Sequence, residues 1–221
     1  MINKYKAHPW HGINIGPDAP SMVTAFIEIV PTDTVKYEID KESGHLKIDR
    51  PQKFSNVVPT LYGFIPQTYC DIKIAEYAAL KTGRDIKKGD GDPLDICVLS
   101  ERAIIHGDIM VQAYPIGGLR LIDKGEADDK IIAIMKDDEV YSGCKDISQC
   151  TVAVINRLKH YFLTYKNIPG LEKPTCEITH VYGREEAYEV INRSIEDYKN
   201  KFSPLQPSQR EGETRDKPHD K

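Results

Sequence analysis

The 221-residue sequence lacks any apolar run long enough to cross a membrane, and its first residues, 1–6, contain no apolar signal-peptide core. Its five cysteines are scattered and form no Cys-x-x-Cys pair, which favours reduced thiols over a disulfide framework. A net charge of −4 leaves no basic excess for nucleic-acid binding through bulk electrostatics. We therefore expect a cytoplasmic globular protein that binds neither membrane nor nucleic acid.

Two catalytic patterns are also missing from the chain. There is no Gly-x-x-x-x-Gly-Lys-Ser/Thr loop, which argues against a nucleoside triphosphate as the substrate, and spacing assigns no Ser-His-Asp or Cys-His arrangement. The chain is 40% hydrophobic and 29% charged, which is ordinary for a globular domain. Its length predicts one domain, at residues 1–202. Residues 203–221 are rich in Pro, Ser and charge without apolar periodicity, and we expect a disordered tail there.

The hydrophobic patterns predict a mainly β core with flanking helices. We expect strands at 22–30, 35–40, 45–50, 94–99, 107–115, 117–122, 131–134 and 176–183, and helices at 71–86, 149–165 and 184–201. Residues 41–44 form a hairpin turn between two strands, and Gly83 ends the first helix. Residues 57–69, rich in aromatic residues and prolines, are expected to form a loop, and Trp10 is expected to cap the core.

Three aspartates lie within six residues in the stretch Asp90-Gly91-Asp92-Pro93-Leu94-Asp95-Ile96, at the entrance to a predicted strand. Such carboxylates repel one another unless cations or solvent neutralise them. Alternation along an extended strand places Asp90 and Asp92 on one face, and Pro93 can re-aim Asp95 onto that face because it forbids a regular ladder. The set suits Mg²⁺ or Mn²⁺, although the stretch alone fits an acidic turn equally well.

A second acidic cluster, at residues 123–130, repeats the theme of carboxylates on a Gly-containing loop at a strand start. Three earlier predicted strands add residues of both signs, namely Glu28, Lys36, Glu38 and Arg50. One such strand alone would be interpreted as a solvated face, but charges of both signs on one barrel face are more typical of a site. Many carboxylates imply several divalent cations, and Lys and Arg among them imply a polyanionic substrate. Phosphoryl chemistry fits both features.

The pattern Asp-x-Asp-Pro-x-Asp at residues 90–95 resembles the signature of the family I soluble inorganic pyrophosphatases. The resemblance continues in the family's order over about residues 22–170, through 27–29, 36–40, Asp49-Arg50, Tyr62-Gly63, Asp123, Asp128, Lys130 and Tyr165-Lys166. It implies an α+β fold with a small, twisted, five-stranded OB-like barrel and helices packed outside. It also implies hydrolysis of inorganic pyrophosphate to two orthophosphates.

The resemblance further implies roles for individual residues. The ligands of several Mg²⁺ ions, for which Mn²⁺ or another divalent ion can substitute, would be Asp90, Asp92, Asp95, Asp123 and Asp128, with Glu28 and Glu38 supporting metal-bound waters. The two phosphoryl groups would be held by Lys36, Arg50, Tyr62, Lys130, Tyr165 and Lys166. Asp92 would be the general base for a metal-bridging water that attacks directly, without a covalent intermediate.

The chain departs from the family pattern at several points. Val58 stands where many members carry a tyrosine, and Lys124 stands where an acidic residue often follows the first aspartate of the second loop. Residues 66–89 form a longer connection than in compact bacterial members, and the segment 66–69 is similar to one in larger, eukaryote-like members. We expect a homo-oligomer, and both the hexamer typical of compact members and the dimer typical of larger ones stay open.

Two other classes of function compete with the pyrophosphatase interpretation. Asp90, Asp92 and Glu101 occupy positions 1, 3 and 12 of an EF-hand loop, but Asp95 stands at position 6, where glycine is needed, and the flanks are predicted strands. An OB-type nucleic-acid-binding module shares the small barrel, but the acidic charge and the carboxylates on the binding face oppose it.

Overall fold

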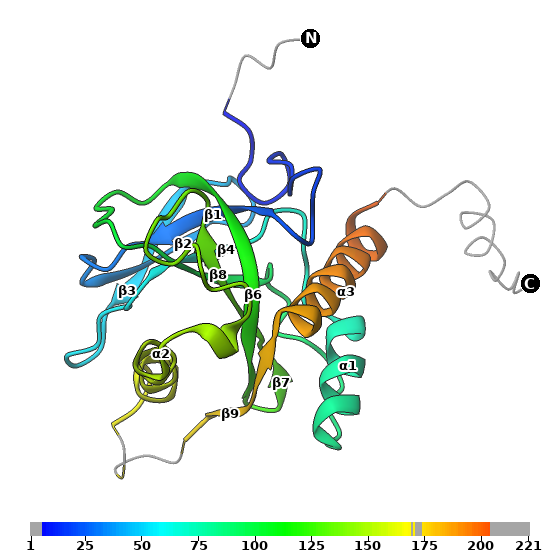
Figure 1. Ribbon diagram of the computed structural model, residues 1–221. Coiled ribbons are helices and arrows are strands. Elements are labelled where there is room, and N and C mark those ends of the chain that lie inside the picture. The colour runs from blue at the N-terminus through cyan, green and yellow to red at the C-terminus, as the bar shows by residue number, and fades with distance from the viewer. Residues whose placement is uncertain (1–5, 169, 171–173, 204–221) are drawn as a thin grey trace, which may run out of the picture.

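The computed structural model describes residues 6–168, 170 and 174–203, and it consists mostly of strands with three helices (Figure 1). The strands are β1 (Val23–Ile29), β2 (Val35–Ile39), β3 (Leu46–Pro51), β4 (Leu61–Phe64), β5 (Asp95–Leu99), β6 (Ile109–Asp123), β7 (Glu126–Ala127), β8 (Lys130–Met135) and β9 (Cys176–Gly183). The helices are α1 (Ile72–Thr82), α2 (Val152–Thr164) and α3 (Arg184–Phe202), with a 3-10 helix η1 (Ile147–Gln149) before α2.

Five strands close a hydrogen-bonded ring in the order β1-β4-β5-β8-β6, because β6 pairs with β8 along one part of its length and with β1 along another. The β2–β3 hairpin forms a separate two-stranded sheet, and β7 and β9 pair with the far end of β6. The ring is twisted and is not a regular barrel. The predicted fold class, a mainly β core of five strands with flanking helices, is confirmed.

Two predictions about the strands were wrong. The strands expected at 107–115 and 117–122 are one strand, β6, in which a register shift between Pro115 and Gly117 accommodates the proline that cannot donate to a ladder. Residues 57–69 are not all loop, because β4 lies within them. Gly63 permits this strand to approach β1, since a Cβ at that position would lie 1.9 Å from the carbonyl oxygen of Phe26. Beyond Ser203, the predicted tail lies outside the described residues.

Apolar side chains pack on both faces of the ring. On β5, Ile96 and Val98 belong to a core cluster with α1 and α3, whereas Cys97 and Leu99 belong to a cluster with α2. The same alternation holds on β8, in accordance with the period of two along a strand. Figure 1 shows α1 and α3 together on one side of the strands and α2 on the other. No helix in the described part of the chain is long and apolar enough to cross a membrane.

The long connection at residues 66–89 contains α1, which α3 holds in place through a buried carboxylate. Asp71 at the N-terminus of α1 makes no capping hydrogen bond with its own side chain. Instead, Asp197 of α3 accepts hydrogen bonds from the backbone N–H groups of Asp71, Lys73 and Ile74 at 3.0, 3.0 and 3.2 Å. These bonds satisfy donors that a helix N-terminus leaves free, so the two helices are joined by more than apolar contact.

A completely buried arginine, Arg120 of β6, lies on the side of the ring that faces α1 and α3. Its guanidinium donates to Asp129 Oδ2 at 3.2 Å and to Glu186 Oε1 at 2.7 Å. The guanidinium carbon also lies 5.1 and 5.0 Å from the ring centroids of Tyr77 and Tyr182. This ion pair holds Asp129 on that side of the sheet. Since successive side chains point to opposite faces, the residues before and after Asp129 are directed to the other side.

Replacing Arg120 with Met removes the charge that compensates Asp129 and keeps most of the apolar volume. We expect the free energy of unfolding to fall by about 3–5 kcal/mol, the usual cost of breaking a buried ion pair. Urea unfolding followed by far-UV circular dichroism measures the change. The matched control is Arg84→Met, which breaks an exposed ion pair with Glu177 and should change the free energy of unfolding far less. Equal losses in the two variants would contradict this assignment.

Candidate active site

One cavity of about 400 Å³ is lined by all thirteen residues that the sequence predicted for the site. These are Glu28, Lys36, Glu38, Arg50, Tyr62, Asp90, Asp92, Asp95, Asp123, Asp128, Lys130, Tyr165 and Lys166. They come from β1 to β6, from the loops before β5 and β8, from β8 itself and from the end of α2. The structure therefore brings the predicted set together, and the chemical role of each residue stays a prediction.

An ion cluster surrounds Lys130 at the cavity, and Lys130 itself is only 2% exposed. Lys130 and Asp95 begin the parallel strands β8 and β5 and lie opposite each other in register. The Lys130 ammonium contacts the carboxylates of both Asp95 and Asp128. Burial lowers the pKa of Lys130, but these two carboxylates outweigh it and raise the pKa well above its usual value. The Tyr62 hydroxyl of β4 adds a hydrogen bond to Asp95 Oδ2 at 2.6 Å.

The β2–β3 hairpin forms a second wall. Lys36 of β2 lies opposite Arg50 of β3, and its ammonium donates to Asp49 Oδ2 at 2.9 Å and to Glu38 Oε2 at 3.2 Å. Burial lowers the pKa of Lys36, but Asp49 and Glu38 outweigh it, and the net shift is upward. Glu28 joins the hairpin to the ring, because its Oε1 accepts a hydrogen bond from the Ile39 N–H at 2.7 Å. Lys36 is thus held as a cation at the cavity wall, and Arg50 lies beside it on β3.

A third wall combines the end of β6 with the end of α2. Lys166 follows α2 and donates to Asp123 Oδ2 at 2.5 Å. Its ammonium also lies 5.1 Å from the ring centroid of Tyr165. Burial lowers the pKa of Lys166, but Tyr165 and Asp123 outweigh it, so the net shift is upward. The other oxygen, Asp123 Oδ1, is buried and has no hydrogen-bond partner among the residues that the structure describes.

Asp90 and Asp92 lie in a bend before β5 and not, as expected, along an extended strand. Gly91 between them has a φ of +75°, and the Asp92 N–H donates to Asp90 Oδ1 at 3.1 Å. The bend is fixed from behind by Cys70, whose N–H donates to the Asp92 carbonyl and whose carbonyl accepts from the Gly91 N–H. A left-handed glycine, rather than strand alternation, therefore places both carboxylates at the cavity.

Burial makes the charged forms of three carboxyl groups in the cavity costly. Burial raises the pKa of Glu28 to about 8, even though the Ile39 N–H favours its charged form. Burial, followed by the charge of Asp128, raises the pKa of Asp90 well above its ordinary value. Burial also raises the pKa of Asp128, although Lys130 opposes the shift. When burial raises the pKa of a carboxyl group in this way, added positive charge stabilises its ionised form.

The donor set fits a divalent cation, because these hard oxygen ligands line one cavity and Asp123 Oδ1 has no hydrogen-bond partner within the described part of the chain. Among the described residues, no three His, Cys, Asp or Glu side chains are already arranged to hold one ion. Lys130 lies in contact with both Asp95 and Asp128 in this arrangement.

The sequence did not predict three charged residues that also line the cavity, namely Lys41, Lys124 and Glu126. Lys41 belongs to the turn of the β2–β3 hairpin, and its ammonium contacts the carboxylate of Asp92. No local signal distinguishes it from an ordinary turn lysine. Lys124 had been noted only as a departure from the family pattern. The other departure, Val58, is buried in the apolar cluster beneath α2, so it contributes no polar group.

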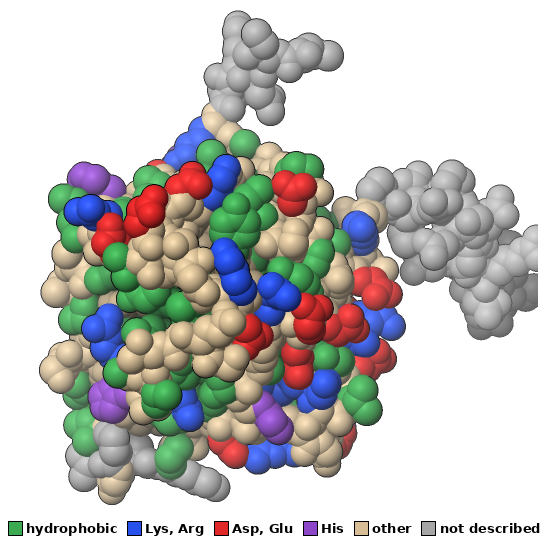
Figure 2. Space-filling view, viewed as in Figure 1, with side chains coloured by type: hydrophobic (Ala, Val, Ile, Leu, Met, Phe, Trp, Pro, Cys, Tyr) green, Lys and Arg blue, Asp and Glu red, His purple; other side chains and the backbone are tan. Residues whose placement is uncertain are grey.

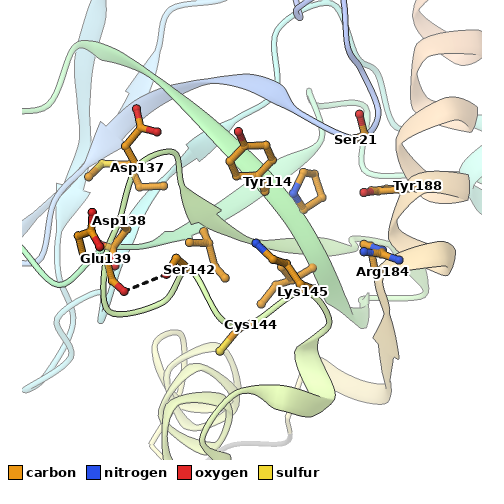
Figure 3. Close-up of a pocket in the computed structure, with 14 residues that line it drawn as sticks. Ser21, Tyr114, Asp137, Asp138, Glu139, Ser142, Cys144, Lys145, Arg184 and Tyr188 are labelled. Atoms are coloured by element: carbon orange, nitrogen blue, oxygen red, sulfur yellow. Dashed lines mark hydrogen bonds between the residues drawn. The ribbon is translucent and has the colours of Figure 1, made fainter.

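A second cavity, of about 370 Å³, lies between β6, the loop after β8 and the start of α3 (Figure 3). Tyr114 and Tyr188 line it, as Figure 3 shows. The apolar side chains of Ile116 and Ile134 line it as well. The buried carboxylate of Asp138 accepts hydrogen bonds from the N–H groups of Glu101 and Tyr141, so it holds the loops. None of the thirteen predicted residues lines this cavity.

The face of the molecule that carries α3 offers no single-sign patch for a nucleic-acid backbone. Figure 2 shows Lys and Arg side chains interspersed with Asp and Glu over this face, with apolar side chains between them. The calcium-loop alternative loses its structural basis, because the acidic stretch leads into the strand β5 and not into a helix.

Comparison with known proteins gives a consistent result. The family model described as inorganic pyrophosphatase matches residues 25–199. An inorganic pyrophosphatase of Chlamydia muridarum is 53% identical over 199 residues, which cover 88% of this chain and 95% of that protein. The soluble inorganic pyrophosphatase 2 of Chlamydomonas reinhardtii is 36% identical over 198 residues, covering 90% of this chain and 92% of that protein.

Comparison of the fold with solved structures agrees with the sequence comparison. The crystal structure of an inorganic pyrophosphatase from Thermus thermophilus superimposes with a TM-score of 0.71 at 29% identity, covering 88% of this chain and 99% of that chain. With sequence, fold and cavity in agreement, this chain belongs to the family I soluble inorganic pyrophosphatases.

Proposed function

We propose that this chain hydrolyses inorganic pyrophosphate to two orthophosphates in the cavity described above, with Mg²⁺ as its divalent cofactor. The observation that carries the proposal is the composition of that cavity, in which buried carboxylates and cations line the same 400 Å³ space. The lysine and arginine side chains can bind a substrate that carries several negative charges, and the carboxylates can bind divalent ions. We further infer that residues 1–202 act as one catalytic domain in a cytoplasmic homo-oligomer, either a dimer or a hexamer.

Divalent ions would be held by five aspartates with two supporting glutamates, namely Asp90, Asp92, Asp95, Asp123, Asp128, Glu28 and Glu38. When bound, such ions supply Lewis-acid activation of water and neutralise charge on phosphoryl oxygens. Glu28 also keeps the β2–β3 hairpin against the ring through its hydrogen bond with Ile39, so it supports the wall that carries Lys36.

The phosphoryl oxygens would be bound from several directions. Lys36 and Arg50 extend from the hairpin, Lys130 and Tyr62 from the ring, and Tyr165 and Lys166 from the end of α2. Because most of these groups are already fixed by packing or by a carboxylate partner, little ordering is required when the substrate binds. The cations would also stabilise the negative charge that the leaving phosphate acquires.

Asp92 is proposed as the general base that receives the proton of the attacking water. Its side chain is 47% exposed, compared with 20% for Asp95 and 10% for Asp128. The Oδ1 atom of Asp92 is buried against the Lys41 ammonium, but about half of the side chain stays exposed in the cavity. A carboxylate with that exposure is better placed to accept a proton from water than Asp95 or Asp128, which Lys130 covers. Direct attack by water needs no nucleophilic side chain.

Replacing Asp92 with Asn tests this role. We expect the rate of phosphate release to fall at least about a hundredfold while the fold is retained, because the amide cannot accept the proton. A colorimetric phosphate assay measures the rate, and circular dichroism measures the fold. The control Asp85→Asn changes an exposed carboxylate outside the cavity and should leave the rate unchanged. Near-wild-type turnover in Asp92→Asn would remove Asp92 from the role of base.

Removal of divalent ions tests the function as a whole. We expect EDTA to abolish phosphate release from pyrophosphate and added Mg²⁺ to restore it, since uncompensated carboxylates then face the polyanionic substrate. Sizing of the same native sample distinguishes a dimer from a hexamer. If the Mg²⁺-loaded protein released no phosphate but retained single-stranded nucleic acid on a filter, the proposed hydrolysis would have to be abandoned in favour of a binding module.

A further inference from the structure

Lys41 occupies a position in the cavity that its sequence context does not indicate. It lies in the turn between β2 and β3, and its ammonium contacts Asp92 and donates to the Gly91 carbonyl at 3.3 Å. The side chain remains 55% exposed and lines the cavity. Unlike Lys130, it therefore approaches the aspartate bend from the open side of the site.

The backbone of this turn is supported by the N-terminal loop. The ring nitrogen His8 Nε2 lies 3.2 Å from the carbonyl oxygen of Lys41, within hydrogen-bond distance. Gly44 of the same turn has a φ of +71°, and a Cβ there would lie 2.8 Å from both His8 Cδ2 and Pro9 Cδ. The turn is thus packed closely at its backbone, while the long side chain of Lys41 extends into the cavity and is more than half exposed.

Asp92 cannot keep this partner and bind a divalent ion with the same oxygen. The ammonium contacts Oδ1, so an ion on that atom would compete with it for the same lone pairs, and an ion on Oδ2 would lie close enough for the two positive charges to repel each other. Lys41 must then move away from Asp92, and its exposed side chain allows this. The released ammonium stays in the cavity, where a bound polyanion would offer it new acceptor oxygens.

We propose that Lys41 is a further substrate-binding residue, which pairs with Asp92 in the metal-free protein and binds a phosphoryl oxygen once a divalent ion has displaced it. The inference rests on the proposed function for its substrate, but the competition between Lys41 and a divalent ion for Asp92 does not depend on turnover. It predicts opposite effects of one substitution on two ligands, which a merely structural role for Lys41 would not produce.

The test is Lys41→Gln, which removes the charge and keeps much of the length. Mn²⁺ binding to the substrate-free protein, measured by electron paramagnetic resonance, should become about threefold tighter because an exposed competing ion pair is lost. Binding of methylenediphosphonate, a non-hydrolysable analogue, to the Mg²⁺-loaded protein should become about tenfold weaker by calorimetry, because a charge-assisted hydrogen bond is lost. The KM for pyrophosphate should rise with little change in kcat.

Two variants serve as controls. Lys41→Arg restores the charge and should return both affinities toward those of the wild type. Lys87→Gln removes the same charge from an exposed pair with Asp85 outside the cavity and should change neither affinity.

Unchanged or weaker Mn²⁺ binding in Lys41→Gln would overturn the competition for Asp92. Unchanged methylenediphosphonate binding would overturn the contact with the substrate. If the wild-type protein released no phosphate from pyrophosphate, the proposed function would fail separately, while the Mn²⁺ measurement would still decide whether Lys41 competes for Asp92.

Discussion

Repulsion between carboxylates gathered in one partly buried cavity is the constraint on which the rest of this structure depends. Burial makes their charged forms costly, and it raises the pKa of Glu28 to about 8. Lysines lie against the aspartates because each contact offsets part of that cost, as Lys130 does for Asp95 and Asp128. Within the described part of the chain, Glu28 and Asp90 have no such lysine contact that offsets their burial, and added positive charge would stabilise their charged forms.

The alternation of side chains on a strand is used twice to maintain this arrangement. At the start of β8, Lys130 faces the cavity, whereas Asp129 faces the opposite side and is held there by the buried Arg120. On β5, Asp95 faces the cavity and Ile96 enters the core beneath α1 and α3. Lys130 and Asp95 are therefore attached to the rigid ring from behind, and their backbones cannot separate without disturbing the packed core.

Most of the helices and strands could be predicted from the sequence, because hydrophobic periodicity and turn residues are local signals that span only a few positions. The hairpin at 35–50, the strand β5 and the three helices were expected close to their observed bounds. The errors occur where a proline or glycine meets a neighbouring strand. Pro115 lies within β6 at a register shift, and Gly63 belongs to β4 because its small size suits contact with Phe26. Both depend on the partner strand, which the local sequence does not specify.

The sequence by itself determined which chemical groups the site contains, because the acidic motif, its glycine and the separate lysines, arginine and tyrosines are a matter of residue type and order. The tertiary structure alone decided how these groups are paired. The partnership of Lys41 with Asp92, and of Arg120 with Asp129 and Glu186, joins segments that approach only when the hairpin, the ring and α3 have packed. Charge–charge contacts depend on distance in space, and local sequence patterns do not fix that distance for segments so far apart in the chain.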